Sequence, residues 1–425
     1  MIAEFVAVLA LFILAFGVIS GRIEKSPITA PMIFVTFGLL MSPWITKVLD
    51  LRVNSELVNL IGTMTLVFVL FTDAARIDLK LLRKYYRMPL RLLGVGLPLT
   101  IVFGALAAVV LFKRLNLWEA AALAIILAPT DAALGQAVVS NPKVPVRIRQ
   151  ALNVESGLND GICLPFLLIA LSLAGTTQGT ETPRYWLGFA LAQVILGPVV
   201  GILVGYLGGK VVSISARKQW MNVNYQRLSL LALAILAYLL AEMVEGNGFI
   251  AAFAAGLTLG NSARDLCPRL FEFGETEGQF LVLLTFIIFG GIMVLPNLSQ
   301  IDAPVILYAV LSLTVARLGG VVLGLAGMHL RRETLLYLGW FGPRGIASVL
   351  HVLLVLDREM IQNRQEIFVI VTVTVLISVF AHGLTAYPGS RWYAARMEGT
   401  VAVPGAAEHE EVEPMPVRLP FRIGG

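Results

Sequence analysis

Charged side chains are scarce in this sequence. Only 14% of the 425 residues are charged and 57% are hydrophobic, whereas soluble domains have about 25% charged and about 45–50% apolar residues. This composition excludes a soluble globular protein. The basic residues, which leave a formal net charge of +5, are scattered among short loops between apolar runs. We therefore expect no nucleic-acid partner.

Cysteine and histidine are scarce as well. The two cysteines, Cys163 and Cys267, and the four histidines show no CxxC or Cys/His spacing, so we expect neither a disulfide framework nor a zinc site. No cofactor is expected. The N-terminal residues MIAEF are acidic rather than basic, and no small-residue cleavage pattern follows the first apolar run. We expect that run to be a retained membrane span rather than a signal peptide.

Long apolar runs fill most of the chain. Many are near 20 residues, the length that a helix needs to cross the hydrocarbon core of a bilayer. Runs such as residues 230–240 are apolar on every side, whereas the strands of a membrane barrel alternate. The sequence therefore predicts an all-α polytopic membrane protein with about thirteen transmembrane helices. They begin near residues 3, 28, 57, 92, 117, 148, 186, 228, 248, 278, 303, 334 and 366.

The distribution of basic residues predicts the orientation. With thirteen spans, the loops after odd-numbered spans and the C-terminal end hold 23 of the 32 Lys and Arg residues, and the other loops hold seven. Merging the runs near 228 and 248 gives twelve spans and destroys this separation. By the positive-inside rule, the N-terminus lies outside and the C-terminus in the cytoplasm of a cell-membrane protein. We expect a membrane domain over residues 1–388 and a short disordered cytoplasmic tail over 389–425.

Seven charged residues lie within or at the ends of the apolar spans. A charge at the bilayer centre costs about 2.5–3.5 kcal/mol on insertion scales, so such residues are candidates for function. They are Asp73, Asp131, Glu155, Asp160, Glu242, Arg317 and Arg344. Arg317 and Glu155 have opposite charges and no other obvious membrane partner, so we predict that they form a structural ion pair. Asp160, with Asp131 and Asp73, then becomes the candidate to titrate.

The sixth span carries an unusually polar stretch, N-V-E-S-G-L-N-D-G, over residues 153–161. At about 100° per residue, Asn153, Ser156 and Asp160 share one stripe of a helix, and Glu155 and Asn159 share the next. Carboxylate, hydroxyl and amide oxygens suit hard cations such as Na+ and the proton, not zinc or copper. The alternative is that these groups only hydrogen-bond between packed helices.

Two spans contain a proline beside a charge. The fifth carries L-A-P-T-D-A over residues 127–132, and the twelfth carries F-G-P-R-G over residues 341–345. Interrupted helices at corresponding places in two halves of a chain point to the midplane site of a transporter. Asp131 is placed to neutralise the positive ends of broken half-helices and Arg344 the negative ends. The alternative is two ordinary proline kinks.

Three ordered motifs resemble the NhaP and NHE type of monovalent cation:proton antiporter. They are A-P-T-D at residues 128–131, E-S-G-L-N-D at 155–160 and G-P-R-G at 342–345. The resemblance implies thirteen spans, with two inverted repeats whose two broken helices cross at the midplane. It also implies a core formed by the helices of about residues 90–175 and 303–388, a separate dimerisation domain and a homodimer.

The same resemblance implies a cation site. Asp160 is the carboxylate that binds cation and proton in turn, with Asp131 nearby. Thr130 contributes a backbone oxygen and Ser156 its side chain. Asp73 stands where relatives carry an acidic ligand on the third span. The expected Na+ ligands are thus Asp160, Ser156, Thr130 and Asp73.

Other positions follow or depart from the family pattern. Asn159 before Asp160 is the pattern of the electroneutral branch, and Glu155 pairs with Arg317 in the family. Ala132 stands where many relatives have proline, which leaves the break of the fifth span less sharply defined.

We therefore expect a transporter rather than an enzyme. The leading hypothesis is electroneutral 1:1 exchange of Na+ for H+ by alternating access at Asp160. The residues do not rank Na+ against K+ or Li+, so a potassium/proton antiporter remains an alternative. So do a cation channel, whose broken helices line a continuous pore, and an intramembrane hydrolase that uses Asp131 and Asp160 as an aspartic dyad.

Overall fold

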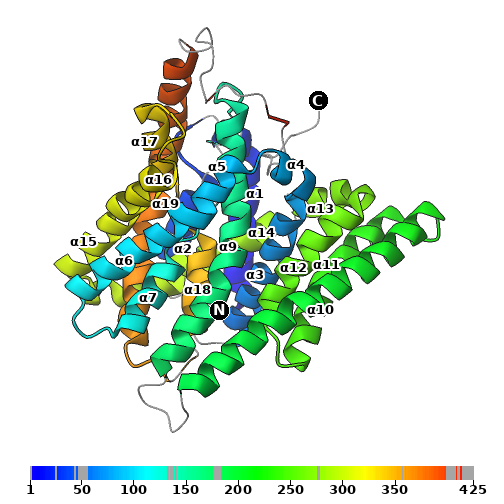
Figure 1. Ribbon diagram of the computed structural model, residues 1–425, viewed down its shortest axis with the longest axis horizontal. Coiled ribbons are helices and arrows are strands. Elements are labelled where there is room, and N and C mark those ends of the chain that lie inside the picture. The colour runs from blue at the N-terminus through cyan, green and yellow to red at the C-terminus, as the bar shows by residue number, and fades with distance from the viewer. Residues whose placement is uncertain are drawn as a thin grey trace.

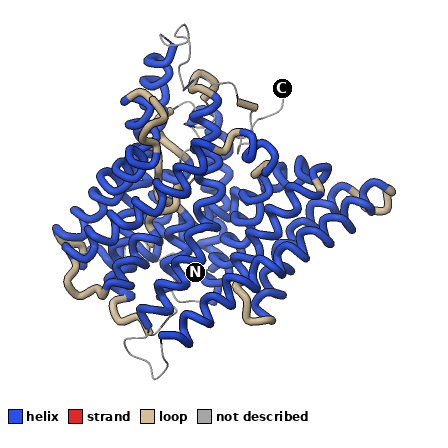
Figure 2. Tube along the Cα trace, in the orientation of Figure 1, coloured by secondary structure: helices blue, strands red, loops and turns tan. Residues whose placement is uncertain are grey.

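Helices are the regular elements of this chain. The computed structural model describes residues 2–23, 26–42, 45, 56–131, 134, 138, 141–175, 183–274, 278–356, 358, 360–398, 408 and 412–413, and these ranges contain no strand (Figure 2). Their long apolar stretches favour helix because a helix satisfies its own backbone hydrogen bonds inside a bilayer.

The helices up to the middle of the chain are α1 (Ile2–Ile23), α2 (Ala30–Met41), α3 (Glu56–Arg76), α4 (Leu79–Lys84), α5 (Arg87–Arg91), the π-helical turn η1 (Leu92–Gly96), α6 (Leu97–Leu111), α7 (Leu117–Ile126), α9 (Val146–Gly175), α10 (Pro183–Arg217) and α11 (Val223–Met243). Next come α12 (Gly248–Ser262), η2 (Arg264–Leu266), α13 (Cys267–Phe273), α14 (Gln279–Ile288), η4 (Phe289–Val294) and η5 (Leu295–Gln300). The last are α15 (Ala303–Leu311), η6 (Ser312–Ala316), α16 (Arg317–Gly324), α17 (Arg332–Trp340), α18 (Ile346–Leu356) and α19 (Arg364–Glu398).

The predicted fold class is confirmed. Within the described ranges, nine helical segments are long and apolar enough to cross a membrane, and four shorter apolar helices, α2, α7, α12 and α18, accompany them. Each of the thirteen predicted spans coincides with one of these segments. The runs near 228 and 248 are separate helices, α11 and α12, because the turn between them ends one helix and Asn247 caps the next.

The helices form two groups around α9. In Figure 1, α10 to α13 lie on one side, and α6, α7 and α15 to α17 lie on the other, with α9 between them. Helix α9 packs against α7 of one group and against α10 and α12 of the other. It also packs against α3. Every residue of its polar stretch 153–161 except Leu158 is buried. The polar stretch of the sixth span is therefore held inside protein rather than against lipid.

Spans four and eleven share a local irregularity. One π-helical turn, η1, interrupts the fourth span between α5 and α6, and another, η6, interrupts the eleventh between α15 and α16. The two spans pack against each other through these turns. Such turns frequently occur at functional sites. Here η6 ends immediately before the intramembrane residue Arg317.

The predicted start of a disordered tail at residue 389 is wrong. Helix α19 continues through Pro388 to Glu398. The ring of Tyr393 stacks on that of Tyr337 in α17, with centroids 4.1 Å apart and planes at 17°, and Met397 is buried. This packing stabilises two more helical turns than the mixed composition of the segment indicates. Most of the remaining tail lies outside the described residues.

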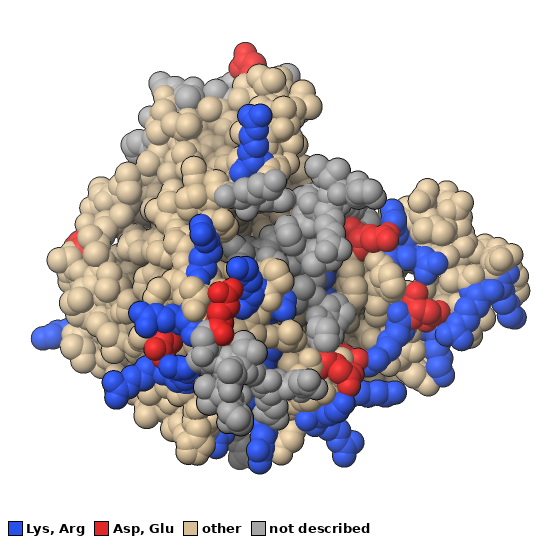
Figure 3. All heavy atoms as spheres, turned by 90° about the horizontal axis from the view of Figure 1, so that it is seen from above, with Lys and Arg blue, Asp and Glu red and all other residues tan. Residues whose placement is uncertain are grey.

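One end of the bundle is markedly basic. Figure 3 looks onto the end at which α4 and the C-terminus lie, and Lys and Arg side chains gather over it. Two ion pairs at this end join distant segments, Lys84 with Glu413 at 2.6 Å and Lys143 with Glu398 at 3.2 Å.

Candidate cation site at two crossing helix breaks

The two proline-containing breaks meet inside the bundle. Helix α7 ends at Ile126, and the chain then runs without helix to Asp131. Residues 341–345 likewise separate α17 from α18. The backbone N–H of Asp131 donates a 2.8 Å hydrogen bond to the carbonyl oxygen of Pro343. Two segments more than two hundred residues apart therefore cross in direct contact.

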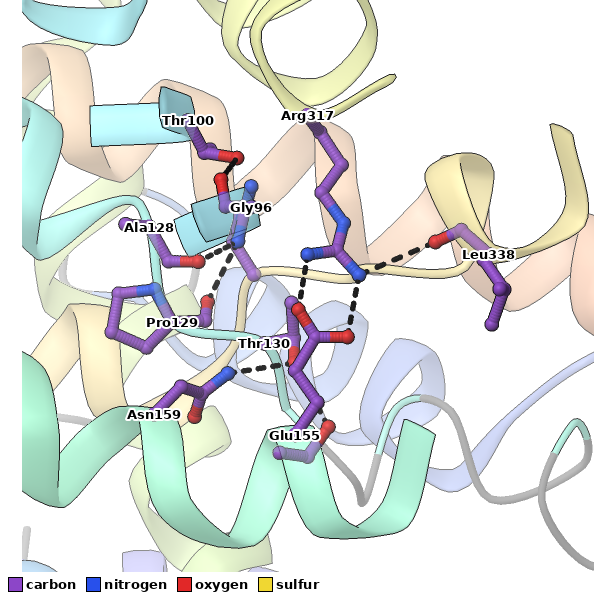
Figure 4. Close-up of polar contacts among 11 residues, drawn as sticks. Gly96, Thr100, Ala128, Pro129, Thr130, Glu155, Asn159, Arg317 and Leu338 are labelled. Carbon is purple, nitrogen blue, oxygen red and sulfur yellow. Dashed lines mark hydrogen bonds and ion pairs between the residues drawn. The ribbon is translucent and has the colours of Figure 1, made fainter. Parts of the chain in front are cut away.

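Each break is compensated by a charge from the other. The guanidinium of Arg344 is fully buried and donates to the carbonyl oxygens of Ala128 and Pro129, the latter at 3.0 Å (Figure 4). These carbonyls lie just beyond the C-terminal, negative end of α7. Conversely, Asp131 Oδ2 accepts the backbone N–H of Ile346 at 2.9 Å, at the positive N-terminal end of α18. Each break therefore supplies the charged side chain that caps the helix end at the other break.

The glycines of the G-P-R-G motif leave room for this arrangement. A Cβ atom at Gly345 would lie 1.9 Å from Asp131 Oδ2, and one at Gly342 would lie 2.5 Å from Arg317 Nε. Both distances are far inside van der Waals contact. Only glycine therefore allows the Asp131 carboxylate and the Arg317 side chain to approach the second break so closely.

Glu155 and Arg317 form a buried ion pair. Arg317 Nη2 donates to Glu155 Oε2 at 2.8 Å and Nη1 donates to Oε1, so the contact is bidentate (Figure 4). The side chain of Arg317 is 1% exposed and that of Glu155 is 0% exposed. Arg317 Nη2 also donates to the carbonyl oxygen of Leu338 at 3.3 Å. The pair thus links α9, α16 and α17 beside the second break.

Hydroxyl and amide groups gather where the first break meets α9. Thr130 Oγ1 lies 2.9 Å from Ser156 Oγ and accepts a 2.8 Å hydrogen bond from Asn159 Nδ2. Thr130, Ser156 and Asn159 are all buried. Asp160 follows Ser156 by one helical turn and is 7% exposed. The structure therefore brings three of the predicted site residues into contact and places the fourth next to them along the helix.

Asp73 approaches the same stretch of α9 from α3. A Cβ atom at Gly157, between Ser156 and Asp160, would lie 3.7 Å from the carbonyl oxygen of Asp73. The side chain of Asp73 is partly buried. The backbone of α3 therefore borders the cluster. Ala132, expected to blur the first break, lies outside the described residues.

Comparison with known proteins identifies the family. The family model described as "Sodium/hydrogen exchanger, transmembrane" matches residues 7–392. The chain belongs to the sodium/hydrogen exchanger family. Its fold matches that of the sodium proton antiporter MjNhaP1 from Methanocaldococcus jannaschii, with a TM-score of 0.75 and 20% identity over 92% of this chain and 99% of that one.

Curated members of the exchanger family are distant in sequence. The K(+)/H(+) antiporter NhaP of Alkalimonas amylolytica is 24% identical over 394 residues, which cover 91% of this chain and 66% of the relative. The probable Na(+)/H(+) antiporter 2 of M. jannaschii is 26% identical over 365 residues, covering 81% and 83%. A probable Na(+)/H(+) antiporter of Schizosaccharomyces pombe is matched over only 43% of its length. This exchanger-family chain thus spans less than two thirds of the first and third of these relatives.

Two hydroxyl contributors to the exchanger's crossing were missed by sequence reasoning. Ser348 Oγ donates to the carbonyl oxygen of Ile126, at the end of α7, at 2.7 Å. Ser378 Oγ accepts the backbone N–H of Arg344 at 2.6 Å and lies 3.1 Å from His382 Nδ1. Nothing distinguishes these side chains in sequence from hydroxyls that bond to their own helix. The only available signal was their position, near the second break and on the next apolar span.

Proposed function

We propose that this chain is a secondary active antiporter that exchanges a monovalent cation for H+, with Asp160 binding the two in turn. The observation that carries the proposal is the position of Asp160, buried one helical turn from Ser156, whose hydroxyl contacts Thr130 of the first break. Glu155 serves the ion pair with Arg317, and Asp131 caps α18. Asp160 is accordingly assigned the transported charge, with Ser156, Thr130 and Asp73 as further oxygen ligands.

The coupling follows from electrostatics. A bare carboxylate in a low-dielectric interior is penalised, whereas a carboxylate loaded with either a cation or a proton is neutral. If only loaded forms of Asp160 change their access between the two sides, cation flux in one direction requires proton flux in the other. One positive charge is exchanged for another, so transport is electroneutral with a 1:1 ratio. Asn159, an amide rather than a second carboxylate, supports this stoichiometry.

Sodium is the cation that we propose first. Hard oxygen ligands suit Na+, and most of the relatives named above are called Na(+)/H(+) antiporters, although the relative from A. amylolytica is called a K(+)/H(+) antiporter. Potassium and lithium are the alternatives within the same mechanism.

The proposed orientation follows the basic end of the bundle. The face in Figure 3 carries many Lys and Arg side chains and is the end at which Figure 1 places α4, so the positive-inside rule assigns it to the cytoplasm. The N-terminus of a thirteen-span chain is then outside. We further propose a homodimer whose two copies meet through α1, where Leu14 and Val18 are 66% and 79% exposed in the protomer. Oxidative crosslinking of a Val18→Cys variant in membranes tests that contact.

The decisive experiment uses purified protein in vesicles with an internal pH dye. Addition of Na+, K+ or Li+ outside should change the internal pH in the wild type, and collapse of the voltage with an ionophore should leave the rate unchanged. Asp160→Asn should abolish the signal. Asp302→Asn is the matched control, because Asp302 caps α15 at the surface through Val305 N–H and asparagine caps equally well. Cation entry without proton movement would instead support a channel.

A further inference from the structure

A pocket of about 160 Å³ lies at the basic end of the bundle, away from the helix crossing. It forms where α4 turns into α5 and meets the first turns of α9. Three basic side chains line it, Lys84, Arg87 and Arg147. No part of the proposed antiport mechanism uses these residues. Their convergence creates a site that favours a multiply charged anion.

A buried amide in the same pocket lacks a partner. Gln150 lines the pocket and is 7% exposed, and its Oε1 atom has no hydrogen-bond partner among the described residues. Buried polar atoms are normally satisfied, and a turn of the Gln150 amide toward the pocket that it lines would let a bound molecule donate to this acceptor. A fully deprotonated anion such as sulfate has no such donor. A phosphate ester with a free hydroxyl satisfies both the cationic side chains and the amide oxygen.

The chain itself places an anion at the rim of this pocket. Two described residues near the C-terminus lie at the pocket: Val412 lines it, and the carboxylate of Glu413 accepts a 2.6 Å hydrogen bond from Lys84 Nζ. The hydrogen bond with Glu413 raises the pKa of Lys84, so the ammonium stays charged. Both side chains are more than half exposed, and exposed pairs of this kind are weak. A better-matched anion can therefore displace the carboxylate.

The pocket lies at the end of a candidate membrane span. Helix α5 begins the fourth span, so Arg87 marks its polar end. The neighbouring side chains Tyr86 and Leu90 are 48% and 58% exposed, the pattern of a tyrosine at the membrane interface followed by a lipid-facing residue. Basic pockets between membrane helices at this level suit anionic headgroups.

We propose that this pocket binds a glycerol phosphate group in competition with Glu413. The phosphate contacts Lys84, Arg87 and Arg147, and a glycerol hydroxyl donates to Gln150. The group belongs either to phosphatidylglycerol in the surrounding membrane or to soluble glycerol phosphate. The proposal is independent of the antiport mechanism, although Gln150 and Asp160 lie on the same helix, about 15 Å apart at 1.5 Å per residue.

The test is thermal unfolding of the purified full-length chain in detergent. Phosphatidylglycerol, phosphatidylcholine, glycerol phosphate and sulfate are titrated separately, and the half-saturating concentration for stabilisation is measured. Stabilisation by phosphatidylglycerol alone assigns the lipid source, and saturation by soluble glycerol phosphate assigns the free one. Lys84→Gln or Arg147→Gln should raise the half-saturating concentration about fivefold, the usual contribution of one basic residue near an anionic headgroup. Glu413→Gln should lower it.

Lys143 and Glu398 provide matched controls, since they form an equally exposed ion pair at the same end of the bundle but outside the pocket lining. Lys143→Gln and Glu398→Gln should leave the titration unchanged. If they shift it as much as the pocket variants do, or if phosphatidylcholine stabilises as well as phosphatidylglycerol, the proposal is overturned. Gln150→Leu is a second variant, to be used if a charge variant fails to fold. It should weaken the binding of glycerol phosphate but not that of sulfate, and an equal effect on both would overturn the proposal.

Discussion

The backbone N–H of Asp131 donates to the carbonyl oxygen of Pro343, and the carboxylate of the same Asp131 caps α18 at Ile346. One residue of the first break therefore makes two contacts with the second. Arg344 of the second break donates to the carbonyl oxygens of Ala128 and Pro129 in the first. The polar backbone groups of each break therefore depend on the other break for hydrogen bonds. We infer that the two breaks move as one unit during transport.

The tight approach at Gly345 is the first point to test. In Gly345→Ala, the new Cβ atom would lie 1.9 Å from Asp131 Oδ2, so the carboxylate must leave the N-terminal end of α18. We expect a loss of about 1–3 kcal/mol in stability, typical of overpacking, together with loss of transport. Gly21→Ala is the control, since nothing lies within 4 Å of its Cβ position. Equal thermal unfolding midpoints for the two variants would contradict the capping role of Asp131.

The buried pair of Glu155 and Arg317 should be far more sensitive to loss of one partner than of both. Arg317→Met leaves the Glu155 carboxylate buried and unmatched, which costs about 3–5 kcal/mol. The double variant Arg317→Met with Glu155→Leu removes both charges and should recover much of the unfolding midpoint. Lys143→Gln, which breaks an exposed pair, should cost less than about 1 kcal/mol. A double variant no more stable than Arg317→Met would show that the arginine acts chiefly through Leu338 O.

Much of this architecture could be predicted from sequence because charges and prolines are rare in membrane spans. Arg317 had few possible partners, and the structure pairs it with Glu155. Pro129 and Pro343 marked the two breaks, since proline removes a backbone donor within a helix. The number of helices followed from the basic residues between them. Each of these inferences rests on a feature that a bilayer makes costly.

Other features depended on packing that no local pattern reveals. Ser378 resembles any serine of an apolar helix until α19 is placed against the second break. The extension of α19 to Glu398 depends on the stacking of Tyr393 on Tyr337 across two helices. The pocket of Lys84 and Arg147 arises only because α4 and the start of α9 meet at one end of the bundle. In none of these cases did the local sequence single out the residues or their neighbours.

Ser378 should prove important although it is uncharged. In Ser378→Ala, the buried N–H of Arg344 loses its 2.6 Å acceptor, and an unsatisfied buried donor costs about 1–3 kcal/mol. We expect a lower unfolding midpoint and slower transport, because the break relaxes. Ser262→Ala is the matched control, since that exposed hydroxyl only bonds to Thr258 O of its own helix. Transport rates that respond equally to both substitutions would argue against a positioning role.

Asn159 should determine whether exchange carries net charge. Its amide donates to Thr130 Oγ1. Asn159→Asp replaces this donor with a second carboxylate beside Asp160, which a single cation no longer neutralises. We expect transport to become voltage-sensitive, measured as a current on a solid-supported membrane. Asn224→Asp adds a charge at the exposed start of α11 and should remain electroneutral. Absence of current in Asn159→Asp would place the control of stoichiometry elsewhere.

Competition between cation and proton for Asp160 makes the pH profile diagnostic. A proton on the carboxylate excludes the cation, so below the pH of half-protonation the apparent KM for Na+ should rise about tenfold per pH unit. The maximal rate at saturating Na+ should not fall over the same range, because excess cation displaces the proton. Initial rates at several Na+ concentrations and pH values separate the two quantities, with Asp302→Asn as a control that keeps the wild-type profile. A KM that stays flat while the maximal rate falls would mean that proton and cation occupy different groups. The exchange would then be coupled by a conformational gate rather than by the occupancy of one aspartate.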